Sequence, residues 1–215
     1  MSKPGSFGTC ALCGARKGKA AMVAHLKGCL ASQPAAKVSG LSDVLLLRAQ
    51  ARGPSIYWVD VAMKREAMLS DLDRLLRRIW LECCGHLSEF YGNGHRKVSM
   101  RTRVGGAFFA VGDRLGYEYD FGSSTELVVS LSGSAEGRFG SPAHLVARNE
   151  APTWPCEECG QPATAVCTQC AYEGKGFCCA EHAAGHGCGE EMMLPVVNSP
   201  RMGVCGYTGE AVRRA

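Results

Sequence analysis

The pattern of apolar and polar positions in the middle of the chain predicts an antiparallel hairpin. VLLLRAQA (44–51) and IYWVDVAM (56–63) are rich in β-branched, aromatic and aliphatic residues, and RGPS separates them. The second run alternates, so that Tyr57, Val59, Val61 and Met63 share one face of the expected strand.

The stretch SDLDRLLRRIWLECCG (70–85) predicts the main helix. Ser70 is a candidate N-cap with Asp73 as its capping-box partner, and Gly85 can supply the left-handed stop. The apolar stripe of this helix follows a 3.6-residue period and consists of Leu72, Leu75, Leu76, Ile79, Trp80 and Cys83. Shorter runs separated by turns, GGAFFAVGD, GYEYDFG, ELVVSLSG and HLVARNE, predict three or four further strands. This order of elements indicates an α+β fold with a central antiparallel sheet and one main packed helix.

Composition supports a globular protein, because 46% of the residues are hydrophobic and 20% are charged. No apolar run approaches the roughly 20 residues that span a bilayer. The first residues, MSKPGSFGTC, lack the apolar region of a signal peptide. Most of the 13 Cys residues are interleaved with His at metal-ligand spacings. We therefore expect a cytoplasmic protein whose thiolates bind metal rather than form disulfides.

Residues 1–31 predict a small zinc finger. CALCGARKGKAAMVAHLKGC has the spacing C-x2-C-x11-H-x3-C. Two Cys on a tight knuckle bring both sulfurs to one point, and a ligand pair at i, i+4 shares one face of a helix. Four such ligands close a tetrahedron, which is the arrangement of structural zinc. The expected ligands are Cys10, Cys13, His25 and Cys29.

Charge is distributed unevenly along the chain. The formal net charge is +4, and the first 42 residues contain Lys and Arg but no Asp or Glu. Any attraction to the phosphates of DNA or RNA is therefore expected in this cationic head, although many small fingers bind protein or only cap a fold. The residues expected to contact nucleic acid are Arg16, Lys17, Lys19 and Lys27. A flexible linker is expected over residues 32–42.

A second ligand-rich stretch, CEECGQPATAVCTQCAYEGKGFCCAEHAAGHGC (156–188), predicts two further zinc sites. Its Cys and His residues form four couples, and eight ligands close two tetrahedra. The order of the couples suits a cross-brace, in which alternate couples share an ion, as in the B-box, MYND and HIT-type fingers that this arrangement resembles. The tight H-x-C couple at the end departs from those fingers. The first site is then Cys156, Cys159, Cys179 and His182, and the second is Cys167, Cys170, His186 and Cys188.

Three cysteines within or after this stretch have alternative interpretations. Cys179 with His182 repeats the two-residue gap of the other couples, whereas Cys178 with His182 spans one helical turn. Cys205 could replace a ligand, but its turn-rich surroundings favour a small buried residue. Protein ligands fill every position of the expected sites, and the H-x-E motif of zinc deaminases does not occur in the sequence. We therefore interpret the three expected zinc ions as structural.

The hairpin, the helix LSDLDRLLRRIWLECCGHLSEF, the signature YEYDFG (117–122) and the tail NSPRMGVCGYTG together resemble the pRiA4b-plasmid open-reading-frame-three-like family. The resemblance covers residues 44 to about 135 and the tail. It implies an α+β fold without a settled biochemical activity. Some relatives are labelled insertion-element passenger, TnpR-like, which implies an association with a mobile element. This chain has Ser123, Thr125 and Leu127 where many members continue as DFGD-x-W-x-H, so any acid or His chemistry at those positions does not carry over.

These patterns predict a finger (1–31), an α+β core (43–150) and a double-zinc module with its tail (151–215). The leading functional prediction is a zinc-stabilised, non-enzymatic binding or adaptor protein. It would contact DNA or RNA through the head or protein through the C-terminal module. The alternative is an enzyme of unknown class with a site in the core near Cys84, His86 and Asp120, because a Cys–His pair can form an activated nucleophile. That alternative predicts a pocket with convergent polar groups at this place.

Overall fold

The structure, a computed structural model, describes residues 6–32 and 40–209 and divides into two compact units. Unit 1 comprises Met1–Leu75, Ser88–Tyr119 and Glu126–Glu150, and unit 2 comprises Leu76–Leu87, Asp120–Thr125 and Ala151–Ala215. Residues 1–31, expected as a finger, fall in unit 1, and the expected core is shared between the units. Of the expected linker, residues 33–39 lie outside the described part of the chain.

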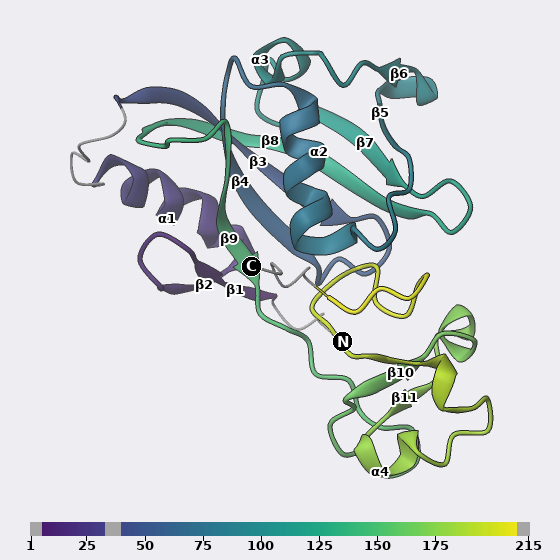
Figure 1. Cartoon of the computed structure of the whole chain (residues 1–215). Helices are drawn as coiled ribbons and strands as arrows, with labels where there is room; N and C mark the ends of the chain where they lie inside the picture. Colours follow the sequence, from purple (N-terminus) through teal and green to yellow (C-terminus); the bar gives the residue numbers. More distant parts are fainter. Residues whose placement is uncertain (1–5, 33–39, 210–215) are drawn as a thin grey trace. The chain divides into compact units, whose positions relative to one another are not determined.

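Unit 1 is built on a nine-stranded sheet with the order β2-β1-β9-β4-β3-β8-β7-β5-β6 (Figure 1). The pairs with a described register are antiparallel, including the expected hairpin, in which Leu47 lies opposite Val61. The α+β class with an antiparallel sheet is therefore confirmed. The strands are β1 (Phe7–Cys10), β2 (Arg16–Gly18), β3 (Ser42–Ala51), β4 (Trp58–Lys64), β5 (Ser88–Tyr91), β6 (Lys97–Val98), β7 (Arg114–Tyr119), β8 (Thr125–Gly137) and β9 (Ala143–Asn149).

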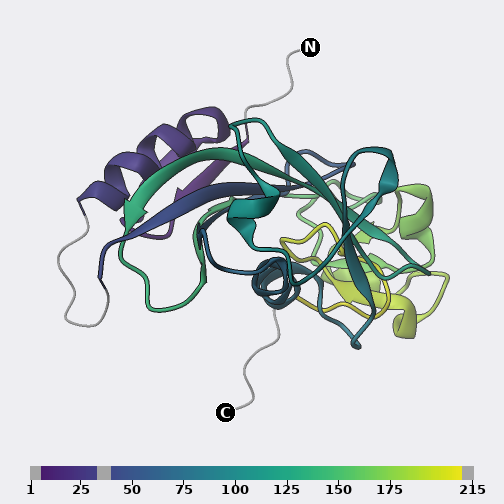
Figure 2. The same ribbon diagram turned by 90° about the horizontal axis from the view of Figure 1, so that it is seen from above.

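Helices α1 (Lys19–Ala31) and α2 (Leu69–Leu76) lie against opposite faces of this sheet (Figure 2). Helix α1 buries Met22, Leu26 and Leu30, which recur every four residues and so share one face. They pack in one apolar cluster against residues of the sheet that include Cys10, Val44, Leu46, Trp58, Ala62, Val146 and Ala147. Because β1 also pairs with β9, the N-terminal segment is a structural layer of unit 1. A one-turn helix α3 (Val104–Ala107) and a 3-10 turn η2 (Asn93–His95) complete the unit.

The main helix differs from its expected boundaries. It begins at Leu69, where the Asp71 carboxylate accepts the backbone N–H of Met68 at 2.9 Å, so the expected cap at Ser70 is wrong. Asp73 instead accepts the Tyr117 hydroxyl at 2.8 Å. The helix continues as a π-helical turn, η1 (Arg77–Leu81), and ends there because Glu82 is extended. Cys83 therefore lies beyond the helix rather than on its apolar stripe.

Unit 2 contains a small three-stranded sheet with the order β11-β10-β12. Its strands are β10 (Ala165–Cys167), β11 (Phe177–Cys178) and β12 (Met193–Pro195), joined by η3 (Cys170–Glu173), α4 (Ala180–Ala183) and η4 (Glu190–Met192). Val166 is buried at its centre, and Trp154 stacks on Phe177 with ring centroids 4.7 Å apart. The three short strands themselves bury few large apolar side chains, so their apolar contacts alone supply little folding free energy. No helix in the described ranges is both long enough and apolar enough to cross a membrane.

Candidate metal centres

Four groups of Cys and His side chains converge in the described part of the chain, and each could hold a metal ion. In each group one ligand atom from each of four residues lies within 4.8 Å of the others. The groups are Cys10, Cys13, His25 and Cys29 (the head group); Cys156, Cys159, Cys179 and His182 (the first tail group); Cys167, Cys170, His186 and Cys188 (the second tail group); and Cys83, Cys84, His86 and Cys205 (the fourth group).

The head group joins a knuckle to a helix, as its spacing predicts. The knuckle after β1 closes where the N–H of Gly14, which has φ +75°, donates to the carbonyl of Cys10 at 2.8 Å. His25 and Cys29 come from one face of α1. The Cys10 Sγ lies 3.9 Å from the Cys29 Sγ, and the Cys13 Sγ lies 3.3 Å from the His25 Nε2. Strand β1 and its knuckle thus position Cys10 and Cys13, and α1 positions His25 and Cys29.

In the first tail group, the structure brings Cys179 rather than Cys178 to the partner residues. The Cys179 Sγ lies 3.8 Å from the Cys159 Sγ and 3.2 Å from the His182 Nδ1. The Cys156 Sγ lies 3.5 Å from the same nitrogen. The Cys178 side chain is buried on the other side of its strand, with its Sγ 3.7 Å from the carbonyl of Gly176. Adjacent residues of an extended segment point to opposite sides, which explains why only one of the two thiols reaches the group.

The second tail group depends on a glycine. The Cys170 Sγ lies 3.7 Å from the Cys188 Sγ and 3.5 Å from the His186 Nε2. Gly176, with φ +87°, passes so close that an added Cβ would lie 2.7 Å from the Cβ of Cys170 and 3.0 Å from that of Cys167. Its carbonyl accepts the N–H of Cys167 at 2.9 Å. A side chain at this position would therefore push the two ligand residues apart.

The fourth group contains two cysteines whose positions differ from those expected from the sequence. Cys83 was expected on the apolar stripe of the helix, and Cys205 was expected to be a small buried residue. Both interpretations are wrong, because Cys83 follows the helix and Cys205 is exposed. Cys84 and His86 are in contact, with the Cys84 Sγ 2.9 Å from the His86 Nε2. The sequence signal for the group was a Cys-Cys-x-His run, and its fourth member lies 121 positions from Cys84.

The donor sets fit zinc. With Zn–S bonds of about 2.3 Å, two sulfurs of a tetrahedral site lie about 3.8 Å apart. The sulfur–sulfur distances in the head and tail groups are 3.9, 3.8 and 3.7 Å. A disulfide requires about 2.05 Å, and all the cysteines are free thiols. Three thiolates and one imidazole are soft and borderline donors, which favour zinc over magnesium or calcium.

Backbone N–H groups lower the pKa of two of these thiols, Cys156 and Cys167. The backbone N–H of Cys179 has the largest effect on Cys156, and together with the N–H groups of Cys159 and Glu158 it lowers the pKa of that thiol to about 6, against the effect of burial. Burial raises the pKa of Cys167, but the N–H groups of Cys170 and Gln169 outweigh it and lower the value to about 7. Donors aimed at a sulfur stabilise the thiolate, which is the form that binds metal.

Two of the cationic side chains expected to meet nucleic acid are engaged within unit 1. Arg16 forms a two-pronged pair with Glu150, in which its Nη2 donates at 2.9 Å, and it also covers the Phe7 ring at 3.8 Å. Glu150 raises the pKa of Arg16, and Arg16 in turn lowers the pKa of Glu150. The Nζ of Lys19 donates to the carbonyl of Ser55 at 2.9 Å, and burial lowers the pKa of Lys19. Lys17 and Lys27 are exposed.

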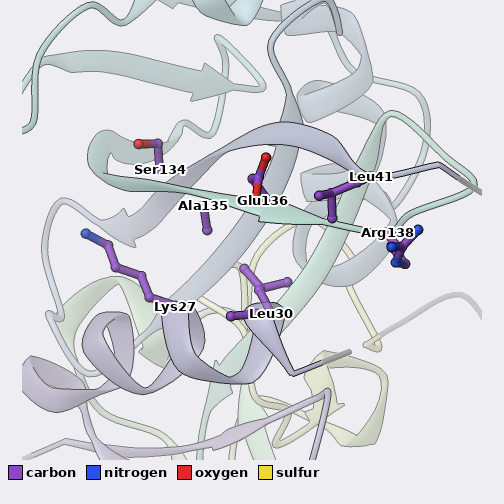
Figure 3. Close-up of a pocket in the computed structure, with 8 residues that line it drawn as sticks. Lys27, Leu30, Leu41, Ser134, Ala135, Glu136 and Arg138 are labelled. Carbon is purple, nitrogen blue, oxygen red and sulfur yellow. The ribbon is translucent and has the colours of Figure 1, made fainter. Parts of the chain in front are cut away.

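A surface hollow of about 390 Å³ lies between α1 and β8 (Figure 3). Lys27, Leu30 and Ala31 come from the helix, Ser134, Ala135 and Glu136 come from the strand, and Leu41 and Arg138 complete the lining. A second hollow, of about 300 Å³, is bordered by residues such as Arg52, Tyr91 and His95. Neither hollow contains Cys84, His86 or Asp120, the residues of the alternative enzyme site.

No family model and no curated protein matches the chain. A solved structure, the protein of unknown function MM3350 from Methanosarcina mazei Go1, is 17% identical, covers 49% of this chain and 67% of its own, and has a TM-score of 0.41.

Proposed function

We propose that this chain is a zinc-stabilised, non-enzymatic binding protein. One observation carries the proposal, which is that the head group and both tail groups each bring four protein donors together. A catalytic zinc keeps three protein ligands and an open position for water, whereas four protein ligands close the tetrahedron. In this proposal one ion holds the knuckle at Cys10 and Cys13 against α1 in unit 1. The other two ions stabilise the small sheet of unit 2.

Protein is the partner class that the surface favours. Phe109 and Val111 are 80% and 72% exposed on a short loop of unit 1. The Asp113 carboxylate fixes this loop by accepting the N–H groups of Phe109 and Ala110 at 2.7 and 2.8 Å. Rigid, exposed apolar side chains are what protein interfaces use as anchors, since little conformational entropy is lost on binding. The pairing of Arg16 with Glu150 reduces the charge that the head can offer to phosphates. An association with a mobile element rests on the family resemblance alone and forms part of the same proposal.

Cobalt substitution tests the closed sites. In cobalt-loaded protein, the visible spectrum should show four-coordinate ions with sulfur ligands, and added azide should leave it unchanged because no position is open. A spectrum that shifts with the added anion would contradict the proposal, because it would show a metal ion with an open coordination position. The cobalt form of a zinc hydrolase with an open position serves as the positive control.

Salt dependence and two loop variants test the partner class. The full chain should bind random-sequence duplex DNA and single-stranded RNA weakly at physiological salt. Tight binding that falls steeply with salt would instead favour nucleic acid.

A photo-crosslinker placed at position 110 should capture a discrete protein in host cells. That capture should be lost in Phe109→Ser and Val111→Ser and retained in Phe7→Ser, a matched change of another exposed apolar residue of unit 1. Capture that persists in the loop variants would contradict the proposed surface.

A further inference from the structure

The fourth group lies entirely within unit 2 and joins two segments that are distant in the sequence. The Cys84 Sγ lies 3.8 Å from the Cys83 Sγ and 3.7 Å from the Cys205 Sγ. These are the separations that a tetrahedral zinc site requires, about 3.8 Å, and they are too long for a disulfide. The His86 Nε2 completes the set at 2.9 Å from Cys84 and 3.2 Å from Cys205. We propose that Cys83, Cys84, His86 and Cys205 bind a fourth zinc ion, which fastens the tail segment 199–207 to the segment 77–87.

The orientation of His86 supports this assignment. Its Nδ1 lies 3.5 Å from the Oδ1 of Asp120, so the opposite ring nitrogen, Nε2, is the one that faces the sulfurs. Metal-binding histidines commonly present their second nitrogen to a carboxylate in this way, which fixes the ring and its tautomer. Asp120 is therefore a positioning residue for the site rather than a ligand.

Asp120 is itself held firmly. Its Oδ1 accepts the backbone N–H groups of Gly122 at 3.1 Å and Ser123 at 3.2 Å, and its Oδ2 accepts the Arg201 Nη2 at 2.6 Å. Arg201 is 0% exposed and also donates to Thr125 Oγ1 at 3.1 Å. The central Asp of the YEYDFG signature thus has a structural role within unit 2. Its carboxylate compensates a buried guanidinium and aligns an imidazole.

Other contacts also hold the two ligand-bearing segments together. The Ser199 hydroxyl donates to the carbonyl of Trp80 at 2.6 Å, and the same oxygen accepts the N–H of Arg201 at 2.9 Å. Tyr207, two residues after the last ligand, is buried. Between these anchors Cys205 has φ +50°, in a region that residues with a side chain seldom occupy. Ligation offsets such a conformational cost, because the bond requires the thiol at that one position.

Accessibility separates this site from the other three. The head and tail groups each contain one buried cysteine, Cys10, Cys156 or Cys167. None of the four residues of the fourth group is buried, and Cys84 and Cys205 are exposed. A chelator can therefore reach the fourth ion more readily, and we expect that ion to leave first.

Native mass spectrometry of the zinc-loaded chain tests the site directly. The wild-type protein should carry four zinc ions, and Cys205→Ser should carry three. Cys178→Ala, which changes a thiol of unit 2 that is outside all four groups, should retain four. The matched Cys156→Ser change should remove an ion of the first tail group and leave the fourth.

Alkylation of the wild-type protein gives a second measurement that needs no variant. In the zinc-loaded chain Cys83, Cys84 and Cys205 should resist iodoacetamide, and a limiting amount of chelator should expose these three before any other cysteine. Three zinc ions per chain, with Cys84 and Cys205 freely alkylated or joined in a disulfide, would overturn the fourth site and leave the proposed function standing. Alkylation of a head or tail ligand in the zinc-loaded chain would instead count against the proposed function.

The role of Asp120 has its own test. Asp120→Asn should weaken binding of the fourth zinc by about 10- to 100-fold in a chelator competition while the other three affinities stay unchanged. Equal weakening at all sites would indicate a general loss of structure and would contradict a positioning role. If the buried Arg201 makes this variant unstable, the imidazole nitrogen resonances of the wild type decide the point, because they should show Nδ1 protonated and Nε2 bound to metal.

Discussion

The N-terminal segment is expected to behave as part of unit 1 rather than as a detachable finger, and Leu26→Ala tests this. Leu26 is 0% exposed and packs in one cluster with Trp58 and Val146 of the sheet. The substitution removes three carbon atoms, worth roughly 2.4 kcal/mol at about 0.8 kcal/mol for each. The cavity that remains raises the expected loss to about 3–5 kcal/mol. The free energy of unfolding of the whole sheet should fall by this amount.

Urea denaturation followed by far-ultraviolet circular dichroism measures the effect, because the nine-stranded sheet contributes much of that signal. With a urea m value of about 1–3 kcal/mol/M, a loss of about 3 kcal/mol lowers the midpoint by roughly 1–3 M. Lys27→Ala, an exposed change on the same helix, should stay within about 0.5 kcal/mol of the wild type. If the two variants unfold at the same midpoint, the helix does not stabilise the sheet and the reasoning is refuted.

Three further predictions follow from single contacts. Gly176→Ala should lower the zinc count by one, because its methyl group would meet the Cβ of Cys170; Gly174→Ala, also at positive φ but in open space, is the control that should keep all ions. Glu150→Gln should strengthen binding to duplex DNA at low salt, because it releases Arg16. The slope of the logarithm of the binding constant against the logarithm of the salt concentration should become steeper by about one unit. Glu126→Gln makes the same charge change at a pair with Arg52 and should have neither effect. Removal of all metal should abolish hydrogen-exchange protection over 156–195 while the strands β3, β4 and β8 stay protected, since the small sheet has few other contacts.

Each of these predictions has a clear contrary result. Equal zinc counts in the two glycine variants would show that the close approach of Gly176 does not matter. Equal DNA binding in the two glutamate variants would show that Arg16 is no more available after the change. Protection of the small sheet in metal-free protein would show that it folds through its own apolar contacts.

Local patterns in the sequence predicted much of this molecule. The hairpin of β3 and β4 was readable because its apolar residues alternate within one short stretch. Three ligand groups were readable for the same reason, since a knuckle or a helical turn brings Cys10 to Cys13, or His25 to Cys29, whatever the rest of the chain does. Signals of this kind need only a few consecutive residues.

Long-range pairing was the part that the sequence could not supply. The fourth group needs Cys205 beside Cys84, and the charge of the head depends on Glu150, which lies 134 positions after Arg16. Only the path of the chain brings such residues together. The end of the main helix was missed for a related reason, because the stripe that reaches Cys83 is periodic but the backbone turns out of the helix at Glu82.

The position of the head in the sheet has a consequence for aggregation. β1 and β2 cover one side of β9, so a chain without residues 6–32 would expose a seven-residue strand with a row of unpaired N–H and C=O groups. In the intact sheet that edge is instead the three-residue β2, which carries Arg16 and Lys17. A short, cationic edge strand discourages other chains from adding to a sheet. The exposed charge of Lys17 on this short edge is therefore expected to discourage copies of this protein from joining edge to edge, a role that requires no nucleic acid.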